Sequence, residues 1–149
     1  MKRLSTLALV AVVVATGISC GDKTPSGPSG PSGPGDLQVR LTAPVGALDS
    51  AIELTISGPA PLTGVTAGSG LRIFQGQLGG SSTNVALIGP LGNGAVILTI
   101  GVQDLARLSQ YHGTISGVAL PNYQLRNLPG GYALALIRLP DPFRRQRPH

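Results

Sequence analysis

Apolar and polar residues alternate along several short runs of this chain, which is the pattern of β-strands with one buried face. In residues 37–41 every second side chain is apolar. Residues 51–56 repeat the pattern, with Ile52, Leu54 and Ile56 on one face and polar side chains between them. Both runs therefore predict strands that pack one face against a core.

The later runs are short, rich in β-branched residues and bounded by glycine or proline, which also indicates strands. Residues 95–100 are apolar on both faces and predict a central strand. In residues 102–108, Leu105 and Leu108 lie three positions apart and predict one helical turn between strands. The remaining strand candidates are residues 70–74, 84–88, 113–118, 123–126 and 132–139, with Leu71, Ile73, Val85 and Leu87 expected in the core.

The turns decide the fold class. Gly92-Asn93-Gly94 contains the Asn-Gly pair typical of a tight hairpin. About seven to nine short strands within residues 36–140, with no long helical period, predict an all-β domain with a single antiparallel β-sandwich. A small barrel is the alternative. In strand rhythm, size and short helical break, the region resembles the immunoglobulin-like or cohesin-like sandwiches of exported bacterial modules, a resemblance that transfers no functional residue.

The first residues have the pattern of a secretory signal. Lys2 and Arg3 precede an unbroken apolar run at residues 7–15, and the small residues Gly17 and Ser19 follow. This run is shorter than the roughly 20 apolar residues that a membrane-spanning helix needs. We therefore expect a cleaved signal peptide at residues 1–19.

The signal ends at Cys20, the single cysteine of the chain. Residues Ile18-Ser19-Cys20 resemble the lipobox of bacterial lipoproteins, although Gly17 stands where that motif usually has leucine. The resemblance implies that Cys20 becomes the first residue of the mature chain and carries a thioether-linked diacylglycerol, usually with an amide-linked acyl chain such as palmitate. The alternatives are an ordinary signal peptide with a coincidental cysteine, or an uncleaved anchor.

Acyl chains at Cys20 would hold the domain at a membrane of the cell envelope, because each buried methylene contributes about 0.8 kcal/mol. In the lipoprotein family, an aspartate directly after the cysteine favours retention in the inner membrane. Gly21 stands at that position here, so we expect the outer membrane instead. The domain would face the periplasm or the exterior.

The segments that flank the domain are polar. Residues 20–35 contain Ser-Gly-Pro three times and predict a disordered, semi-extended linker that spans up to about 45 Å. Residues 141–149 contain three arginines and predict a basic disordered tail, with contact to anionic lipid or an envelope polymer as the alternative. The chain thus divides into residues 1–19, 20–35, 36–140 and 141–149.

The formal net charge of +5 is concentrated at the two ends of the chain. Inside the predicted domain, five arginines face four acidic residues, so the charge is nearly balanced. A nucleic-acid surface would need clustered cations, preferably interleaved with aromatic side chains. We therefore expect no nucleic-acid partner.

Candidate catalytic and metal-binding residues are few. Asp104, Ser109 and His112 lie close in sequence, but no nucleophile-elbow glycine pattern surrounds Ser109. Two histidines and scattered acids give no metal-ligand spacing. The sequence therefore predicts a protein that is not an enzyme and needs no cofactor.

Two functions remain. The first is a lipid-anchored envelope module that binds another envelope protein or has a structural role. The second is a carbohydrate-binding module, which would use exposed aromatic platforms. The aromatic candidates in the domain are Phe74, Tyr111, Tyr123 and Tyr132, of which Tyr111 and Tyr123 are the possible ligand contacts. The partner, the strand order and the oligomeric state do not follow from the sequence.

Overall fold

The structure is a computed structural model that describes residues 32–127 and 131–139. The expected signal peptide, the lipidation site at Cys20 and the basic tail at residues 141–149 lie outside the described residues. Of the expected linker, only residues 32–35 are described. The domain is therefore the part of the chain on which the structure bears.

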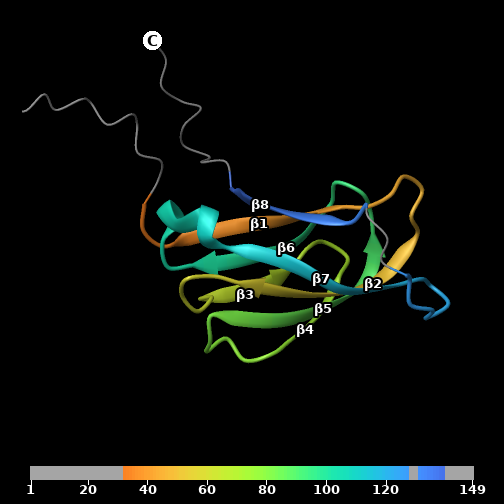
Figure 1. The fold of residues 1–149 in the computed structure, drawn as a ribbon, viewed down its shortest axis with the longest axis horizontal. Coiled ribbons are helices and arrows are strands. Elements are labelled where there is room, and N and C mark those ends of the chain that lie inside the picture. The colour runs from red at the N-terminus through yellow and green to blue at the C-terminus, as the bar shows by residue number, and fades with distance from the viewer. Residues whose placement is uncertain (1–31, 128–130, 140–149) are drawn as a thin grey trace, which may run out of the picture.

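The described residues form eight strands and one short 3₁₀ helix, and the expected all-β sandwich is confirmed (Figure 1). In chain order the elements are β1 (Gly35–Thr42), β2 (Asp49–Ser57), β3 (Gly64–Ala67), β4 (Arg72–Gln75), β5 (Ser82–Leu91), β6 (Val96–Val102), η1 (Leu105–Gln110), β7 (His112–Ala119) and β8 (Ala133–Arg138).

Two antiparallel four-stranded sheets pack face to face. Sheet A has the order β3-β6-β1-β8, and sheet B has the order β4-β5-β2-β7. The alternating apolar residues of β1 and β2 face each other between the sheets, as do Val85 and Leu87 of β5. The apolar run of β6 is a central strand of sheet A, as its sequence predicted.

The Asn-Gly turn is present, but the predicted hairpin is wrong. The Ala95 N–H donates to the Gly92 carbonyl at 3.2 Å, which closes a turn, and Gly94 has a φ of +78°. This turn leads from β5 in sheet B to β6 in sheet A, and the Asn93 side chain accepts a hydrogen bond from the Ala43 N–H at 3.0 Å. A turn sequence specifies the local bend and not the sheet that the next strand joins.

Crossing between the sheets is the rule in this fold. Of the connections between the described strands, β4–β5 alone joins neighbours in one sheet. The orders β4-β5-β2 and β3-β6 repeat the D-E-B and C-F orders of immunoglobulin sheets. The flanking strands differ, because β1 pairs with β6 where the seventh immunoglobulin strand would lie, and β7 pairs with β2 where the first would lie.

The sequence pattern missed one strand, β3, and wrongly indicated another at residues 123–126. β3 is only four residues long, and its alternation is too short to stand out. Residues 123–126 form no strand, because Tyr123 takes a positive φ of 64° in a turn and only Leu125 forms a β-bridge, with Ala119. The helical turn predicted for residues 102–108 is found as η1, displaced by about one turn towards the C-terminus.

Both ends of the described domain lie at the same end of the sandwich (Figure 1). β1 begins at Gly35, and β8 ends at Arg138, which pairs with Leu37 near the start of β1. The β1–β2, β3–β4, β5–β6 and β7–β8 connections lie at the opposite end, which we call the distal end. A segment that enters at Gly35 therefore joins the domain at the end away from these loops.

Candidate interaction surface

The outer face of sheet B carries a shallow hollow of about 190 Å³. Its outward-facing residues come from the central and edge strands of the sheet and from the β7–β8 loop. We call this hollow the apolar groove, and it is formed by Ala51, Glu53, Ala86, Ile88, Gly117, Ala119 and Leu125. Small side chains make its floor, so the hollow follows from the absence of bulk on β2, β5 and β7.

Larger apolar side chains stand on both sides of this floor. Phe74 on β4 is 58% exposed and pairs with Ala86, and Ile88 on β5 is also exposed. Leu125 is 79% exposed and approaches Gly117 from the opposite side. Exposed apolar side chains scattered singly are ordinary, but Ile88 and Leu125 line the groove and Phe74 borders it beside Ala86.

Two charges complete the groove. Glu53 lies in the floor, between Ala86 and Gly117, and Arg72 lies at its edge, beside Ile88. Both side chains are exposed, and within the described residues neither forms an ion pair. The groove therefore presents one negative and one positive group without internal compensation.

Polar side chains cover the other half of the outer face of sheet B. Towards the end with the termini, the Thr55 hydroxyl donates to Asn84 Oδ1 at 2.8 Å, and Ser57 and Ser82 lie within hydrogen-bond distance. On the outer face of sheet A, Gln38 pairs with Thr99. Within sheet B, the apolar outward positions are thus gathered on one half, while on sheet A Ala135 and Ile137 of β8 also face outward.

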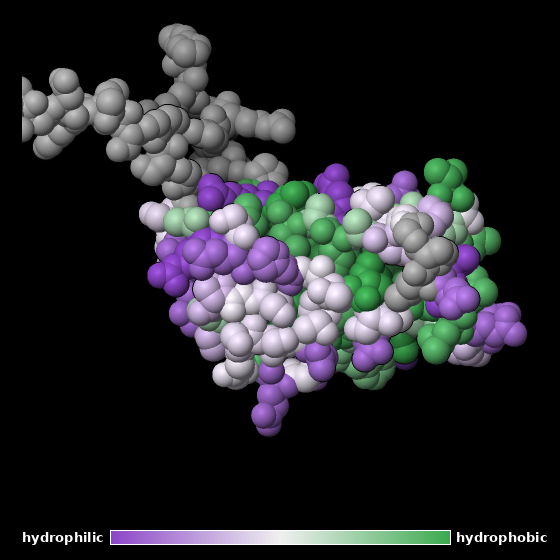
Figure 2. Space-filling model, viewed as in Figure 1, coloured by the Kyte–Doolittle hydropathy of each residue, from purple (hydrophilic) through white to green (hydrophobic). Residues whose placement is uncertain are grey.

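The loops at the distal end add a second apolar surface. Val45 is 98% exposed, and Leu48 in the same β1–β2 loop and Tyr123 in the β7–β8 loop are also exposed. We call these three residues the distal loop residues. Figure 2 shows apolar surface extending to the end that carries the β1–β2 loop, while hydrophilic surface surrounds the end with the termini.

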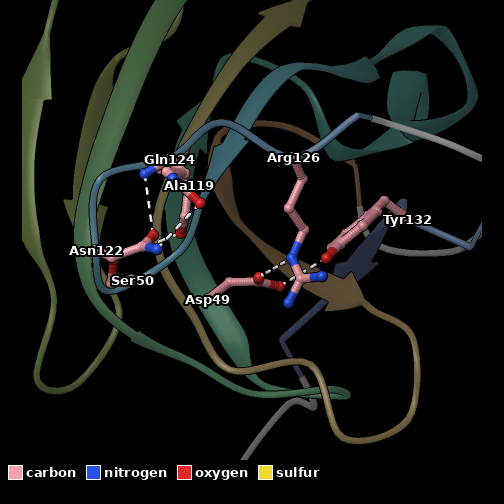
Figure 3. A network of polar contacts seen from close by, with 7 residues as sticks. All are labelled: Asp49, Ser50, Ala119, Asn122, Gln124, Arg126 and Tyr132. Atoms are coloured by element: carbon pink, nitrogen blue, oxygen red, sulfur yellow. Dashed lines mark hydrogen bonds and ion pairs between the residues drawn. The ribbon is translucent and has the colours of Figure 1, made fainter.

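The buried carboxylate of Asp49 anchors the β7–β8 loop, which carries both Leu125 of the apolar groove and Tyr123 of the distal loop residues (Figure 3). Asp49, at the start of β2, accepts hydrogen bonds from Arg126 Nε and from the Tyr132 hydroxyl, the latter at 2.7 Å. The hydrogen bond to Asp49 raises the pKa of Arg126. Burial, and next the hydrogen bond to Asp49, raise the pKa of Tyr132. We call these three residues the clasp, because they hold both sides of the β7–β8 loop against β2.

The backbone completes the placement of Leu125. The Leu120 N–H donates to the Gln124 carbonyl at 3.0 Å, and the Arg126 N–H donates to the Val118 carbonyl at 2.8 Å. Asn122 accepts a hydrogen bond from the Gln124 N–H within the turn. This pairing holds residues 124–126 along the edge of β7, so the Leu125 side chain has a fixed position beside the groove.

The two tyrosines proposed as ligand contacts lie far apart. Tyr111 is 4% exposed, and its ring packs over Gly58 in the core, so it offers no platform for a sugar. Tyr123 is 91% exposed on the β7–β8 loop. Because Tyr111 precedes β7 and Tyr123 follows it, the eight residues of that strand separate them by roughly 25 Å. They cannot form one stacking surface.

The other aromatic and catalytic candidates have defined places. Phe74 lies on the groove and Tyr132 belongs to the clasp. The Asp104 carboxylate accepts hydrogen bonds from the Ala106 N–H at 2.9 Å and from the Gly33 N–H at 3.0 Å, and these two bonds lower the pKa of Asp104. Asp104 thus caps η1 and fixes the chain before β1. Within the described residues, Ser109 and His112 form no hydrogen bond to each other or to Asp104.

Sequence reasoning missed both the groove and the clasp. The strand pattern placed Glu53 on the solvent side, which is correct. It gave no sign that Ala51, Ala86 and Ala119 share one face, because they belong to three strands whose order was unknown. Asp49 and Arg126 are 77 positions apart, and no motif links them.

Among the described residues, no group of three or more His, Cys, Asp or Glu side chains is arranged to hold a metal ion, and no helix is long and apolar enough to cross a membrane. No protein family, curated protein or solved structure compared with this chain matches it.

Proposed function

We propose that this chain is a lipid-anchored protein of the cell envelope whose β-sandwich binds another protein and performs no catalysis. The lipobox-like residues Ile18-Ser19-Cys20 and the Ser-Gly-Pro linker support an anchor on the N-terminal side. By the sorting logic of bacterial lipoproteins, Gly21 favours the outer membrane.

One observation carries the binding role. The chain enters the domain at one end of the sandwich, and the exposed distal loop residues Val45, Leu48 and Tyr123 lie at the other end. A tether at the opposite end of the domain leaves these side chains free to face away from the membrane. Large apolar side chains exposed at one end of a domain are typical of a contact with another macromolecule.

The anchor is tested by Cys20→Ser. The parent chain should be recovered with membranes and carry acyl groups on its N-terminal peptide by mass spectrometry, whereas the Cys20→Ser chain should move to the soluble fraction. Gly21→Asp serves as a matched variant that keeps the thiol and should shift the chain from the outer to the inner membrane. If the Cys20→Ser chain stays with membranes as the parent does, the anchor proposal is wrong.

The binding role is tested separately, on the parent chain in its membrane. A photo-crosslinking amino acid at Val45 should capture a defined envelope protein, and the same probe at Thr66, which pairs with Thr99 on the outer face of sheet A, should not. Equal capture from both positions would contradict a distal binding end.

A further inference from the structure

The apolar groove on sheet B has a surface that is complementary to itself. Across this face the strands follow the order β4, β5, β2, β7. The bulky side chains Phe74 and Ile88 stand on β4 and β5, and the small residues Ala51 and Gly117 stand on β2 and β7. The β4–β5 half of the face is therefore higher than the β2–β7 half, where Glu53 is the one long side chain in the groove floor and Leu125 stands beyond β7.

A two-fold axis that runs parallel to the strands, between β5 and β2, brings the raised half of one copy onto the low half of another. The axis exchanges β4 with β7 and β5 with β2. Phe74 of one copy then lies over Gly117 of the second copy, beside its Leu125, and Ile88 lies over Ala51 of the second copy. Such isologous matching, in which one patch contacts itself, is how most soluble dimers assemble.

The same two-fold axis also brings the charged residues Glu53 and Arg72 of the two copies close together. The axis places Glu53 of one copy over Ala86 of the second copy, one strand and one pair of residues away from its Arg72. Strand and residue spacings put the two backbone positions about 8 Å apart in the plane of the face, within reach of an arginine side chain. Glu53 and Arg72, which have no ion pair within one described chain, would pair twice across the interface.

We propose that the outer face of sheet B binds a second copy of this chain, and that the two copies lie parallel. The parallel arrangement rests on the proposed function: an axis along the strands keeps the chain termini of both copies at the same end, so neither linker has to run along the sandwich to reach a shared membrane. An axis across the strands would put the termini at opposite ends.

The size of the face sets the strength of the dimer. Four strands about 4.8 Å apart and about 20 Å of each strand give a face of roughly 400 Å². Stable interfaces bury about 800 Å² of accessible surface on each partner. The dimer is therefore weak in solution, and anchoring in one membrane strengthens it by raising the effective concentration.

The first test is sedimentation equilibrium on residues 20–149 with Cys20→Ser, the chain expected after signal cleavage, which needs no membrane and so does not depend on the anchor. We expect a reversible monomer–dimer equilibrium between about 10 µM and 1 mM. Adding Phe74→Glu should raise the dimer Kd by about 30-fold or more, since a central aromatic residue is a typical hot spot and is used twice. The matched control Tyr123→Glu, an aromatic-to-acid change on the distal loops, should leave the Kd within about twofold.

The charge pair has its own test. Glu53→Arg alone and Arg72→Glu alone should each weaken the dimer, and the double variant should restore it. A purely structural effect of either substitution on the exposed face would not be reversed by the other.

The orientation is tested with nitroxide labels at Ser57→Cys, at the polar end of the same face, in the Cys20→Ser chain. Parallel copies place the two labelled backbone positions about 11 Å apart, and an axis across the groove places them about 35 Å apart. A chain that stays monomeric at about 1 mM, a Phe74→Glu chain that dimerises as its parent does, or a long label distance would each overturn the proposal. The membrane fractionation of the parent chain tests the anchor separately, so none of these results decides whether the anchor proposal holds.

Discussion

Replacement of Tyr132 by phenylalanine removes a single hydroxyl from the clasp. That hydroxyl donates to Asp49 Oδ2 at 2.7 Å, and the Asp49 side chain is buried. A hydrogen bond to a charged group contributes about 1.5–3 kcal/mol, and a buried carboxylate that loses a donor is left partly desolvated without compensation. We therefore expect Tyr132→Phe to lower the free energy of unfolding by about 2 kcal/mol, or Tm by about 8 °C for a domain of this size.

Urea denaturation followed by circular dichroism measures this change. The matched control is Tyr123→Phe, which makes the same chemical change at an exposed phenol and should alter the free energy of unfolding by less than about 0.5 kcal/mol. If the Tyr132→Phe and Tyr123→Phe variants are equally stable, the hydroxyl of Tyr132 does not support the clasp and the reasoning fails.

The pH dependence gives an independent check on the same residue. Burial and the Asp49 carboxylate raise the pKa of Tyr132 above the ordinary value of 10.0, so the folded chain keeps this proton to a higher pH than the unfolded chain does. The stability that Tyr132 contributes is thus fully present below about pH 10 and is lost as the pH rises through the raised pKa. The Tyr132→Phe chain should show a smaller alkaline loss, and an identical loss in both chains would contradict the assignment.

The remaining predictions concern the core, the sheet connections and the start of the domain. Leu54→Ala removes a fully buried side chain between the sheets and should cost about 2–5 kcal/mol in urea denaturation. Gly68→Ala should lower Tm, because a Cβ at this position overlaps the Val96 carbonyl oxygen. Asp104→Asn should speed hydrogen exchange at the Gly33 amide. Two backbone hydrogen bonds lower the pKa of Asp104, so the parent chain should lose stability as the pH falls through that lowered pKa. The Asp104→Asn chain should not show this acid loss.

The first two of these changes have matched controls in the chain. Leu48→Ala removes the same side chain from an exposed position and should change stability by less than about 0.5 kcal/mol. Gly79→Ala adds a Cβ that meets nothing within 4 Å and should leave Tm unchanged. Controls that destabilise as much as the test variants would show that burial and crowding are not the causes.

The inward half of the fold could be predicted from the sequence because burial imposes a period of two. Ile52, Leu54 and Ile56 were expected on the core face and all are buried. The central position of β6 followed in the same way, from a run that is apolar on both faces. Where the run is only four residues long, as in β3, the period has too few repeats to be recognised.

Strand order could not be predicted, and the errors follow from that. Asn93 and Gly94 form the tight turn that their residue types favour. Whether the next strand joins the same sheet or the opposite one depends on long-range packing between the two sheets. Tyr111 lies beside a strand whose sequence is partly polar, and only the packing of its ring over Gly58 reveals that it is buried. Non-local contacts of this kind leave no local pattern.

The outward positions of sheet B carry information of a different kind. A solvated face needs polar side chains, and its terminal half has them, with Thr55, Asn84 and Ser57. The other half has alanine and glycine where nothing in the core requires a small residue, since these side chains point away from it. The apolar groove lies on the outer face of sheet B, and the clasp holds Leu125 beside it. Its small residues are explained if another protein surface packs into the groove.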